Sequence, residues 1–447
     1  MVYRVVKSLL ILIINNFYRI KVRNGHRVPL KDPLIIVSNH TNAFLDSLSM
    51  SIVLKQNMFS LPRGNVFLNS SKVLKWLFTG IGMIPIYRKL EGAENLKRND
   101  ETFERCFKIM KDKGTIHIYP EAICIYERKL KSIKKGAARI LLGAEERNDY
   151  SLNSKVIVCG LIYEEAAQFN TNLLFNFSKP FSLRESIDIY KENNVLGINH
   201  LTKKIGEKML PNIVHVENKQ LVNLVRNIEL IYRSELAIRN RMDPKNQSHQ
   251  FFLSKHIANA INYFNSNDIE QLNGLAERIG KYLKTLKRAS FLDKDIHHSL
   301  GLNHILKGIF LTLLLPFCLW GLINNFLILI ISKIIADKVV KRIEFRGSVL
   351  FLSGMCSVLL LYPLQMIFFY LYFDSIVYLA IYMLLLPITS RLAFLFSREY
   401  VSWFNMFKGY IMKLLRLSEF KNLQKERTAL IEELDLMVIG YRKRHLK

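Results

Sequence analysis

The sequence is poor in acidic residues, in cysteine and in the short motifs of metal and nucleotide sites. Its 447 residues include 37 Asp and Glu against 64 Lys and Arg, so the formal net charge is +27. The 5 cysteines lie far apart without a CxxC pair, which argues against a disulfide framework or a zinc site and fits a reducing compartment. No HExxH spacing and no phosphate-binding glycine loop occur. The sequence therefore predicts neither a resident metal nor a resident cofactor.

Low hydrophobicity, the mark of a disordered polycation, is also absent, because 50% of the residues are hydrophobic. Strong positive charge in an apolar chain is typical of a nucleic-acid binder or of a protein at an anionic membrane surface. Residues 308–332 and 347–373 contain no charged residue, and a third apolar stretch follows Asp374 and runs to Ser390. Such runs are typical of membrane segments rather than of a very apolar soluble core. Membrane lipids are thus an expected partner, and nucleic acid is not.

The first 24 residues contain five basic residues and no acid, around the apolar run Leu9–Ile14. This run is too short to span a bilayer, and no small-residue cleavage site follows it. We expect a basic amphipathic membrane-associated helix over residues 1–24. The alternative is a helix that packs on the domain behind it.

The rest of the chain divides by its pattern of hydrophobic residues. Short apolar runs at 33–38, 83–87, 115–119 and 156–159 read as buried strands, and helical patterns such as 100–113 and 136–146 separate them. This alternation predicts an α/β domain over residues 25–190. We expect a helical region at 191–300, a membrane domain at 301–398 and a cytoplasmic amphipathic helical tail at 399–447.

The membrane topology poses a problem. The segment between the first two apolar runs is rich in Lys and Arg, which places it in the cytoplasm by the positive-inside rule. The α/β domain, with free cysteines and no signal, is expected on the same side. We therefore expect residues 308–332 to form a re-entrant hairpin that turns near Pro316 or Asn324-Asn325. Residues 347–373 would cross outward, Asp374 would face outside, and residues 375–396 would return.

A histidine and an aspartate follow the first predicted strand, in the stretch Asn39-His40-Thr41-Asn42-Ala43-Phe44-Leu45-Asp46. Ligand sites of α/β domains favour such strand ends. A histidine can take a proton from an alcohol, and a nearby carboxylate can orient it and stabilise the imidazolium. Read alone, the pair also fits a histidine with a structural role.

Two further strand ends carry charged residues. Gly82-Met-Ile-Pro-Ile-Tyr-Arg88 ends in an arginine suited to bidentate phosphate binding, or to a surface ion pair. Tyr119-Pro120-Glu121-Ala122 ends another strand, and by itself fits an ordinary turn with a solvated glutamate. The fourth stretch, from Val156 through Gly160 to Tyr163, reads as core.

In order and spacing, these four stretches resemble the blocks of the glycerolipid acyltransferase family, the lysophosphatidic acid acyltransferase-like superfamily. Its blocks are NHxxxxD, GxIxxxR, FPEG and an apolar strand with a proline. Arg63-Gly64-Asn65-Val66-Phe67 and the run from Lys134 to Arg139 are also similar to the family. The C-terminal half resembles, more loosely, the branch with fungal glycerol-3-phosphate/dihydroxyacetone-phosphate acyltransferases and bacterial relatives. The resemblance implies an α/β core with a mixed sheet flanked by helices.

The sequence departs from the family pattern at three points. His40 and Asp46 are one residue further apart than the motif requires, so the backbone between them needs a local adjustment if the two are to meet. Ala122 stands where the family has glycine, and its Cβ could crowd a ligand or exclude a positive φ. The proline of the fourth block is missing.

The resemblance implies acyl transfer from a thioester to a glycerol-phosphate hydroxyl, with no acyl-enzyme. His40 would be the general base, and Asp46 would hold and charge-stabilise its imidazole. Arg88, or more weakly Lys89, would bind the acceptor phosphate, and Glu121 would shape the acceptor site. Gly82, Pro120, Arg63 and Lys134 are further candidate substrate-binding residues.

The substrates stay open at this stage. Acyl-CoA or acyl carrier protein would be the donor and co-substrate. The acceptor would be glycerol 3-phosphate, dihydroxyacetone phosphate or lysophosphatidic acid, and an aminolipid is a further alternative. A catalytically weak or inactive membrane scaffold that retains the fold is the alternative to an enzyme, and Ala122 and the longer His–Asp spacing are its best support.

Overall fold

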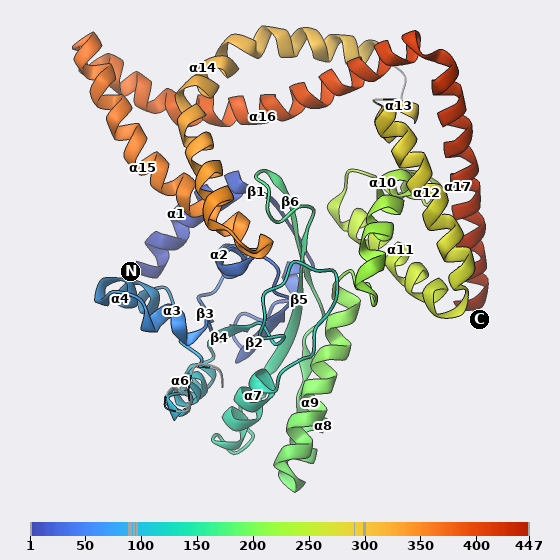
Figure 1. Cartoon of the computed structure of the whole chain (residues 1–447). Coiled ribbons are helices and arrows are strands. Elements are labelled where there is room, and N and C mark those ends of the chain that lie inside the picture. Colours follow the sequence, from blue (N-terminus) through green and yellow to red (C-terminus); the bar gives the residue numbers. More distant parts are fainter. Residues whose placement is uncertain are drawn as a thin grey trace. The chain divides into compact units, whose positions relative to one another are not determined.

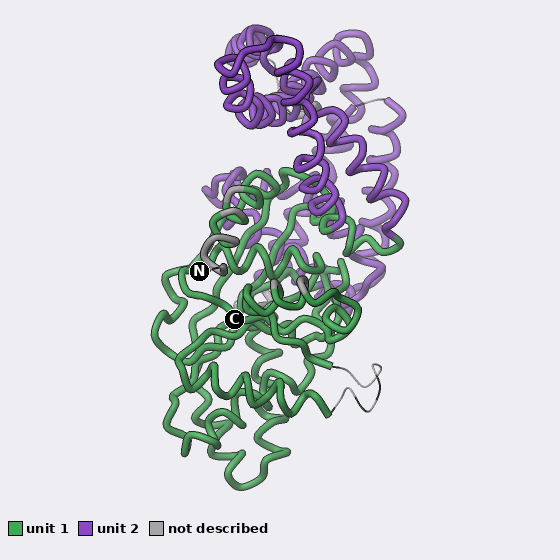
Figure 2. The backbone as a smooth tube through the Cα atoms, turned by 90° about the vertical axis from the view of Figure 1, so that its left-hand side faces the viewer, with its two compact units in different colours: residues 1–215, 341–348 green, residues 216–340, 349–447 purple. Residues whose placement is uncertain are grey.

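The computed structural model describes residues 2–87, 92, 94, 97–289, 291–297 and 301–445 (Figure 1). The chain divides into two compact units, which Figure 2 distinguishes by colour. Unit 1 comprises residues 1–215 and 341–348, and unit 2 comprises residues 216–340 and 349–447. The two units are described separately.

Unit 1 is built on a mixed sheet. Its strands are β1 (Tyr18–Arg23), β2 (Leu34–Ser38), β3 (Met58–Ser60), β4 (Thr115–Ile118), β5 (Lys155–Tyr163), β6 (Thr171–Phe177) and β7 (Phe181–Ser182). The order is β1-β6-β5-β2-β4-β3, with β7 paired to β5. Strands β6 and β7 are antiparallel to β5, and the remaining pairs of strands are parallel. Every residue of β2 is buried, as expected of a central strand in an α/β domain.

Helices enclose this sheet, which confirms the predicted fold class. They are α1 (Val2–Phe17), α2 (Ala43–Val53), α3 (Gly64–Leu68), α4 (Lys72–Gly80), α6 (Asn99–Lys111), α7 (Gly136–Glu146), α8 (Arg184–Glu192) and α9 (Asn194–Met209). Apolar side chains of α6, α7 and α9 share one core with those of β2, β4 and β5. Short 3₁₀ turns, Gly25–Arg27 (η1), Leu210–Asn212 (η3) and Ile343–Phe345 (η5), complete unit 1.

Three of the four predicted strands are present, at β2, β4 and β5. The fourth, at 83–87, makes only isolated bridges, Ser60 to Met83 and Arg63 to Ile86. Pro85 lies between the two bridges and has no N–H to donate to a ladder, which explains the interruption.

The predicted helix over residues 1–24 is correct only for its first part, because α1 ends at Phe17 and β1 follows. Basic and apolar residues alternate with period two from Arg19 to Arg23, which is a strand pattern. The end of α1 packs on the domain behind it, since Ile14 and Phe17 are buried and Lys7 Nζ donates to the carbonyl oxygen of Leu54 at 2.5 Å.

The α/β unit also extends beyond the predicted boundary at residue 190. Leu201, Ile205 and Met209 of α9 are buried in the core that α7 shares with the sheet. Gly160 of β5 packs against η3, the 3₁₀ turn that follows α9, so closely that a Cβ at Gly160 would be 1.8 Å from the carbonyl oxygen of Asn212. The predicted helical region therefore begins at residue 216, not at 191.

Unit 2 is helical throughout its described residues. Its helices are α10 (Val222–Arg239), α11 (Gln247–Asn267), α12 (Ile269–Arg288), α13 (Asp293–His297), α14 (Leu302–Val339), α15 (Arg346–Phe373, whose first turn lies in unit 1), α16 (Ile376–Leu415) and α17 (Leu417–His445), with a 3₁₀ turn, η4, at Lys219–Leu221. Three helices, α14, the η5–α15 segment and α16, are long and apolar enough by length and composition to cross a membrane.

The predicted hairpin within residues 308–332 is wrong, because α14 is one continuous helix that bends without reversing (Figure 1). Asn324 and Asn325 do not form a turn. Their Nδ2 atoms donate to the carbonyl oxygens four residues earlier, and their Oδ1 atoms accept from the hydroxyls of Tyr382 and Tyr362. Tyrosines on α16 and α15 thus satisfy the amides that a turn would otherwise expose.

The boundary at 399 is also wrong, since α16 continues to Leu415 before α17 begins. The predicted tail helix is present as α17. It packs on the other helices of unit 2 through buried residues including Phe420, Leu423 and Leu434, and ion pairs join Arg278 to Glu433 and Arg239 to Asp435.

Candidate active site

The site begins where β2 ends and the chain turns into α2. His40 follows the strand, and Asp46 lies in the first turns of the helix. Ala43, at the start of α2, has φ 40, and the backbone N–H groups of Thr41 and Asn42 both donate to Asp46 Oδ2 at 2.8 Å. This curled turn accommodates the extra residue between His40 and Asp46, so the longer spacing does not separate them.

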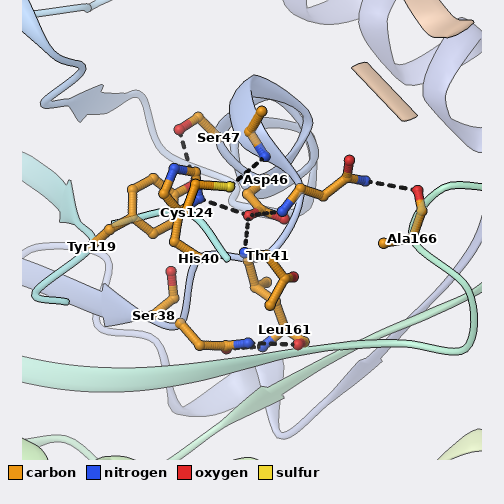
Figure 3. A network of polar contacts seen from close by, with 12 residues as sticks. Ser38, His40, Thr41, Asp46, Ser47, Tyr119, Cys124, Leu161 and Ala166 are labelled. Atoms are coloured by element: carbon orange, nitrogen blue, oxygen red, sulfur yellow. Dashed lines mark hydrogen bonds and ion pairs between the residues drawn. The ribbon is translucent and has the colours of Figure 1, made fainter. Parts of the chain in front are cut away.

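Asp46 is the centre of the site (Figure 3). Its side chain is fully buried, and its Oδ2 lies 2.8 Å from His40 Nδ1. Tyr163, at the end of β5, donates its hydroxyl to the other carboxylate oxygen at 2.7 Å. Burial and the nearby Asp46 charge raise the pKa of Tyr163, so its proton stays available for this bond. Four donors therefore hold the carboxylate in place.

The plane of the His40 ring is fixed from one side by Tyr119. The two rings stack with centroids 3.8 Å apart and an interplanar angle of 14°, and the Tyr119 hydroxyl pairs with Ser47 Oγ at 2.9 Å. Since Nδ1 faces a carboxylate, the hydrogen belongs on Nδ1, and Nε2 keeps its lone pair for a proton. The arrangement suits a general base.

A second histidine lies behind Tyr119 in the sheet. His117 is buried, and desolvation lowers its pKa to about 3. Its Nε2 pairs with Ser38 Oγ at 2.7 Å, so it stays neutral and adds no charge beside the pair of His40 and Asp46.

Glu121 is 6% exposed, and its Oε2 accepts from the backbone N–H of Lys131 at 2.9 Å. Burial raises the pKa of Glu121 to about 7, although hydrogen bonds from the backbone of Lys131 and of His40 oppose the shift. The carboxyl can therefore donate or accept a hydrogen bond near neutral pH. The loop that carries it also touches the His40 loop, because the N–H of Ile125 donates to the His40 carbonyl at 3.1 Å.

Ala122, in the position of the family's glycine, has φ 54, a left-handed conformation that favours glycine. We expect Ala122→Gly to stabilise unit 1 by about 1 kcal/mol, since a left-handed residue with a Cβ carries a penalty of that size. The measurement is the thermal midpoint. Ala144→Gly, inside α7, is the matched control and should lower the midpoint. A lower midpoint for Ala122→Gly as well would contradict the expectation.

The other predicted substrate-binding residues occupy different places. Gly82 has φ 82, and a Cβ there would lie 2.7 Å from the Met58 carbonyl oxygen, so its role is in the backbone. The Pro120 carbonyl accepts from the N–H of Lys134 at 2.8 Å, while Lys134 Nζ donates to Ser132. Arg63 is exposed at the start of α3. Arg88 and Lys89 lie outside the described residues.

Two tyrosines of this site were not predicted from the sequence. Tyr163 falls within the stretch that reads as core, and Tyr119 within the turn before Glu121. A tyrosine at the end of a buried strand is a possible signal, because a buried hydroxyl needs a partner. No grouping of three His, Cys, Asp or Glu that could hold a metal occurs among the residues that the structure describes.

Comparison with known proteins finds a family profile that covers most of this site. The Acyltransferase family profile matches residues 19–161, the stretch that contains His40, Asp46 and Glu121. This match agrees with the resemblance of residues 19–161 to the glycerolipid acyltransferase family that the sequence motifs carry. The profile match ends within β5, two residues before Tyr163.

Two relatives from this family align with parts of the chain. Glycerol-3-phosphate O-acyltransferase 2 of Saccharomyces cerevisiae is 30% identical over 112 residues, which are 25% of this chain and 15% of the relative. The chloroplastic 1-acyl-sn-glycerol-3-phosphate acyltransferase of Arabidopsis thaliana is 25% identical over 129 residues, 27% of this chain and 32% of the relative. The chain therefore aligns with less than a third of the length of either relative.

Among solved structures, the 1-acyl-sn-glycerophosphate acyltransferase PlsC of Thermotoga maritima aligns with 46% of this chain and 77% of its own, at 12% identity and a TM-score of 0.31.

Proposed function

We propose that this protein is a membrane-bound O-acyltransferase. It would move a fatty acyl group from acyl-CoA or acyl carrier protein to a hydroxyl of a phosphorylated glycerol acceptor. The observation that carries the proposal is the pair of His40 and a fully buried Asp46 that is held by four donors. Such a pair is a general base with a fixed orientation.

The reaction needs no covalent enzyme intermediate. Nε2 of His40 takes the proton of the acceptor hydroxyl as that oxygen attacks the thioester carbonyl carbon. Asp46, on Nδ1, stabilises the imidazolium that forms. The tetrahedral intermediate then collapses, the carbon–sulfur bond breaks, and the thiolate leaving group takes a proton back from the imidazolium. The free cysteines need no part in this sequence, because burial raises the pKa of the nearest, Cys124, to about 12.

The acceptor's phosphate would be bound by arginine and lysine. Arg88 is the first candidate and Lys89 the weaker one, and both follow the stretch that begins at Gly82. The backbone of Arg63 pairs with Ile86, which is two residues before Arg88 in the sequence. Lys134 is exposed beyond Glu121. The relatives' names favour glycerol 3-phosphate or lysophosphatidic acid as acceptor, and the large C-terminal half favours the former.

The decisive experiment is an assay matrix on purified membranes. Acyl-CoA and acyl-loaded carrier protein are each tested against glycerol 3-phosphate, dihydroxyacetone phosphate and lysophosphatidic acid, with His40→Ala as the control. We expect turnover with at least one pair and loss of it in the variant. Failure of all pairs would favour an inactive scaffold that retains the fold.

We further propose that the catalytic unit faces the cytoplasm and that α14 does not cross the bilayer. Residues 341–348, after α14, belong to the catalytic unit. Before α14, the described part of residues 216–301 contains no helix long and apolar enough to cross. Both ends of α14 are then on the catalytic side, which supports a bent helix that lies along one leaflet of the bilayer without crossing it. The hairpin of α15 and α16 would cross and return, with Asp374 outside.

Cysteine labelling tests this topology. We expect Asp374→Cys to react with a membrane-impermeant maleimide in intact cells, and Lys338→Cys to react only after permeabilisation, since both positions are exposed in the fold. The background is Cys356→Ser, because Cys356 is the exposed one of the five free cysteines. Reaction of Cys at 338 in intact cells would show that α14 crosses.

A further inference from the structure

Residues 341–348 connect α14 to α15, yet they are part of unit 1. We name them the bracing segment. We propose that the bracing segment is a positioning element of the active site, which holds the His40 loop and the Glu121 loop in their working arrangement. The inference rests on the acyltransferase function proposed above.

The C-terminal part of the bracing segment contacts the His40 loop. The Ser348 hydroxyl donates to the Asn42 carbonyl at 3.3 Å, and both side chains are buried. Gly347 packs directly on Asn42 and Ala166, since a Cβ there would lie 2.5 Å from the Ala166 carbonyl oxygen and 2.7 Å from Asn42 Oδ1. Glycine is needed because the backbones approach too closely for any side chain.

Asn42 connects the bracing segment to the pair of His40 and Asp46. Its backbone N–H donates to Asp46, so displacement of Asn42 moves a donor of the carboxylate that orients His40. On its other side, Asn42 Nδ2 donates to the Tyr18 hydroxyl at 2.6 Å and to the Ala166 carbonyl at 3.2 Å. Asn42 is 1% exposed, so it has no room to move alone.

The N-terminal part of the bracing segment contacts the loop after Glu121. Arg342 Nη2 donates to the Cys124 carbonyl at 2.9 Å and pairs with Glu344 at 3.1 Å. Glu344 is 7% exposed and accepts a hydrogen bond from the backbone of Tyr126. Glu344 is therefore fixed against the loop, and the half-exposed Arg342 reaches the loop through the Cys124 carbonyl.

The two loops also meet each other, where the Ala43 N–H donates to Cys124 Sγ at 3.1 Å (Figure 3). The bracing segment thus joins both sides of an arrangement whose members are His40, Asp46 and Glu121. The bracing segment also follows the end of α14 and includes the first turn of α15. The chain therefore connects these two apolar helices to the loops that carry His40 and Glu121. Displacement of a catalytic group by about 1 Å can lower turnover by 10²-fold.

The test is Gly347→Ala in the full-length protein in membranes. We expect kcat to fall by about 10-fold to 10²-fold with little change in the acceptor KM, because a displaced base affects the transition state rather than ground-state binding. The matched control is Gly354→Ala in the same helix, where the nearest atom is Ser332 Oγ at an ordinary 3.5 Å. Its kcat should equal that of the unaltered protein.

A second readout does not depend on activity. Diethyl pyrocarbonate labels accessible neutral imidazoles, and the rate at His40 can be followed by peptide mass spectrometry, with His249 as an internal reference. We expect faster labelling of His40 in Gly347→Ala than in Gly354→Ala. If the unaltered protein transfers no acyl group, the labelling still decides whether the bracing segment positions His40, and only the proposed function fails.

Arg342→Gln provides a milder variant should Gly347→Ala fail to fold. It removes the bond to the Cys124 carbonyl without adding bulk, and Lys341→Gln is its control. Arg342→Gln should lower kcat and speed His40 labelling, and Lys341→Gln should do neither. The proposal is overturned if the variants of the bracing segment match their controls in both readouts, or if activity falls only in proportion to the folded fraction.

Discussion

His40→Ala is expected to lower kcat by about 10³-fold, within the range that general-base catalysis supplies. The imidazole is the group whose Nε2 would accept the hydroxyl proton, while its Nδ1 is 2.8 Å from Asp46. The acceptor KM should change little, because a base acts mainly in the transition state. The measurement is steady-state kinetics with the best donor and acceptor from the assay matrix.

Asp46→Asn should also be severely impaired, because the amide cannot stabilise an imidazolium as a carboxylate does. The substitution also places an NH₂ group where four donors converge, so we expect Asp46→Asn to lower the stability of unit 1 as well. The double variant should be close to His40→Ala alone, since the two residues act as a unit.

His249→Ala is the matched control for the loss of an imidazole. His249 lies in α11 of unit 2 and hydrogen-bonds to the backbone of Asp243, so its loss should leave kcat unchanged. Activity of His40→Ala within about tenfold of the unaltered protein would show that His40 is not the base.

Arg427→Met is expected to destabilise unit 2 by about 3–5 kcal/mol, the usual loss when one partner of a buried ion pair is removed. Arg427 on α17 is 8% exposed. Its Nε lies 3.1 Å and 3.2 Å from the two carboxylate oxygens of Asp293, and its Nη1 lies 3.0 Å from Glu235. Its Nη2 donates to the Ile231 carbonyl, so one guanidinium joins α17 to α10 and α13.

The measurement is the thermal midpoint of the purified protein, together with limited proteolysis of α17. Arg416→Met is the control, since Arg416 forms an exposed pair with Glu419 and should contribute less than about 1 kcal/mol. Neutralising the partners as well, in Arg427→Met with Asp293→Asn and Glu235→Gln, should regain part of the stability. A midpoint for Arg427→Met equal to that of the Arg416 control would contradict the role of Arg427.

The sequence determined the α/β class, the position of the pair of His40 and Asp46, and the apolar segments. β2, β4 and β5 are short, branched and buried, and strands of this kind are recognisable from local pattern alone. His40, Asp46 and Glu121 could be located because each follows such a strand, where α/β domains place their ligand sites. The absence of charge at 308–332 and 347–373 likewise needs no tertiary information.

Only the tertiary structure decided which distant residues complete the site. Tyr163 donates to Asp46 across the sheet, and Gly347 packs on Asn42 from a segment about three hundred residues away in the sequence. The continuous course of α14 was decided by tyrosines on other helices that satisfy Asn324 and Asn325. Such contacts join residues that are far apart in the sequence, and a local hydrophobic pattern holds no information about them. They form only because the folded chain brings these residues within hydrogen-bonding or packing distance.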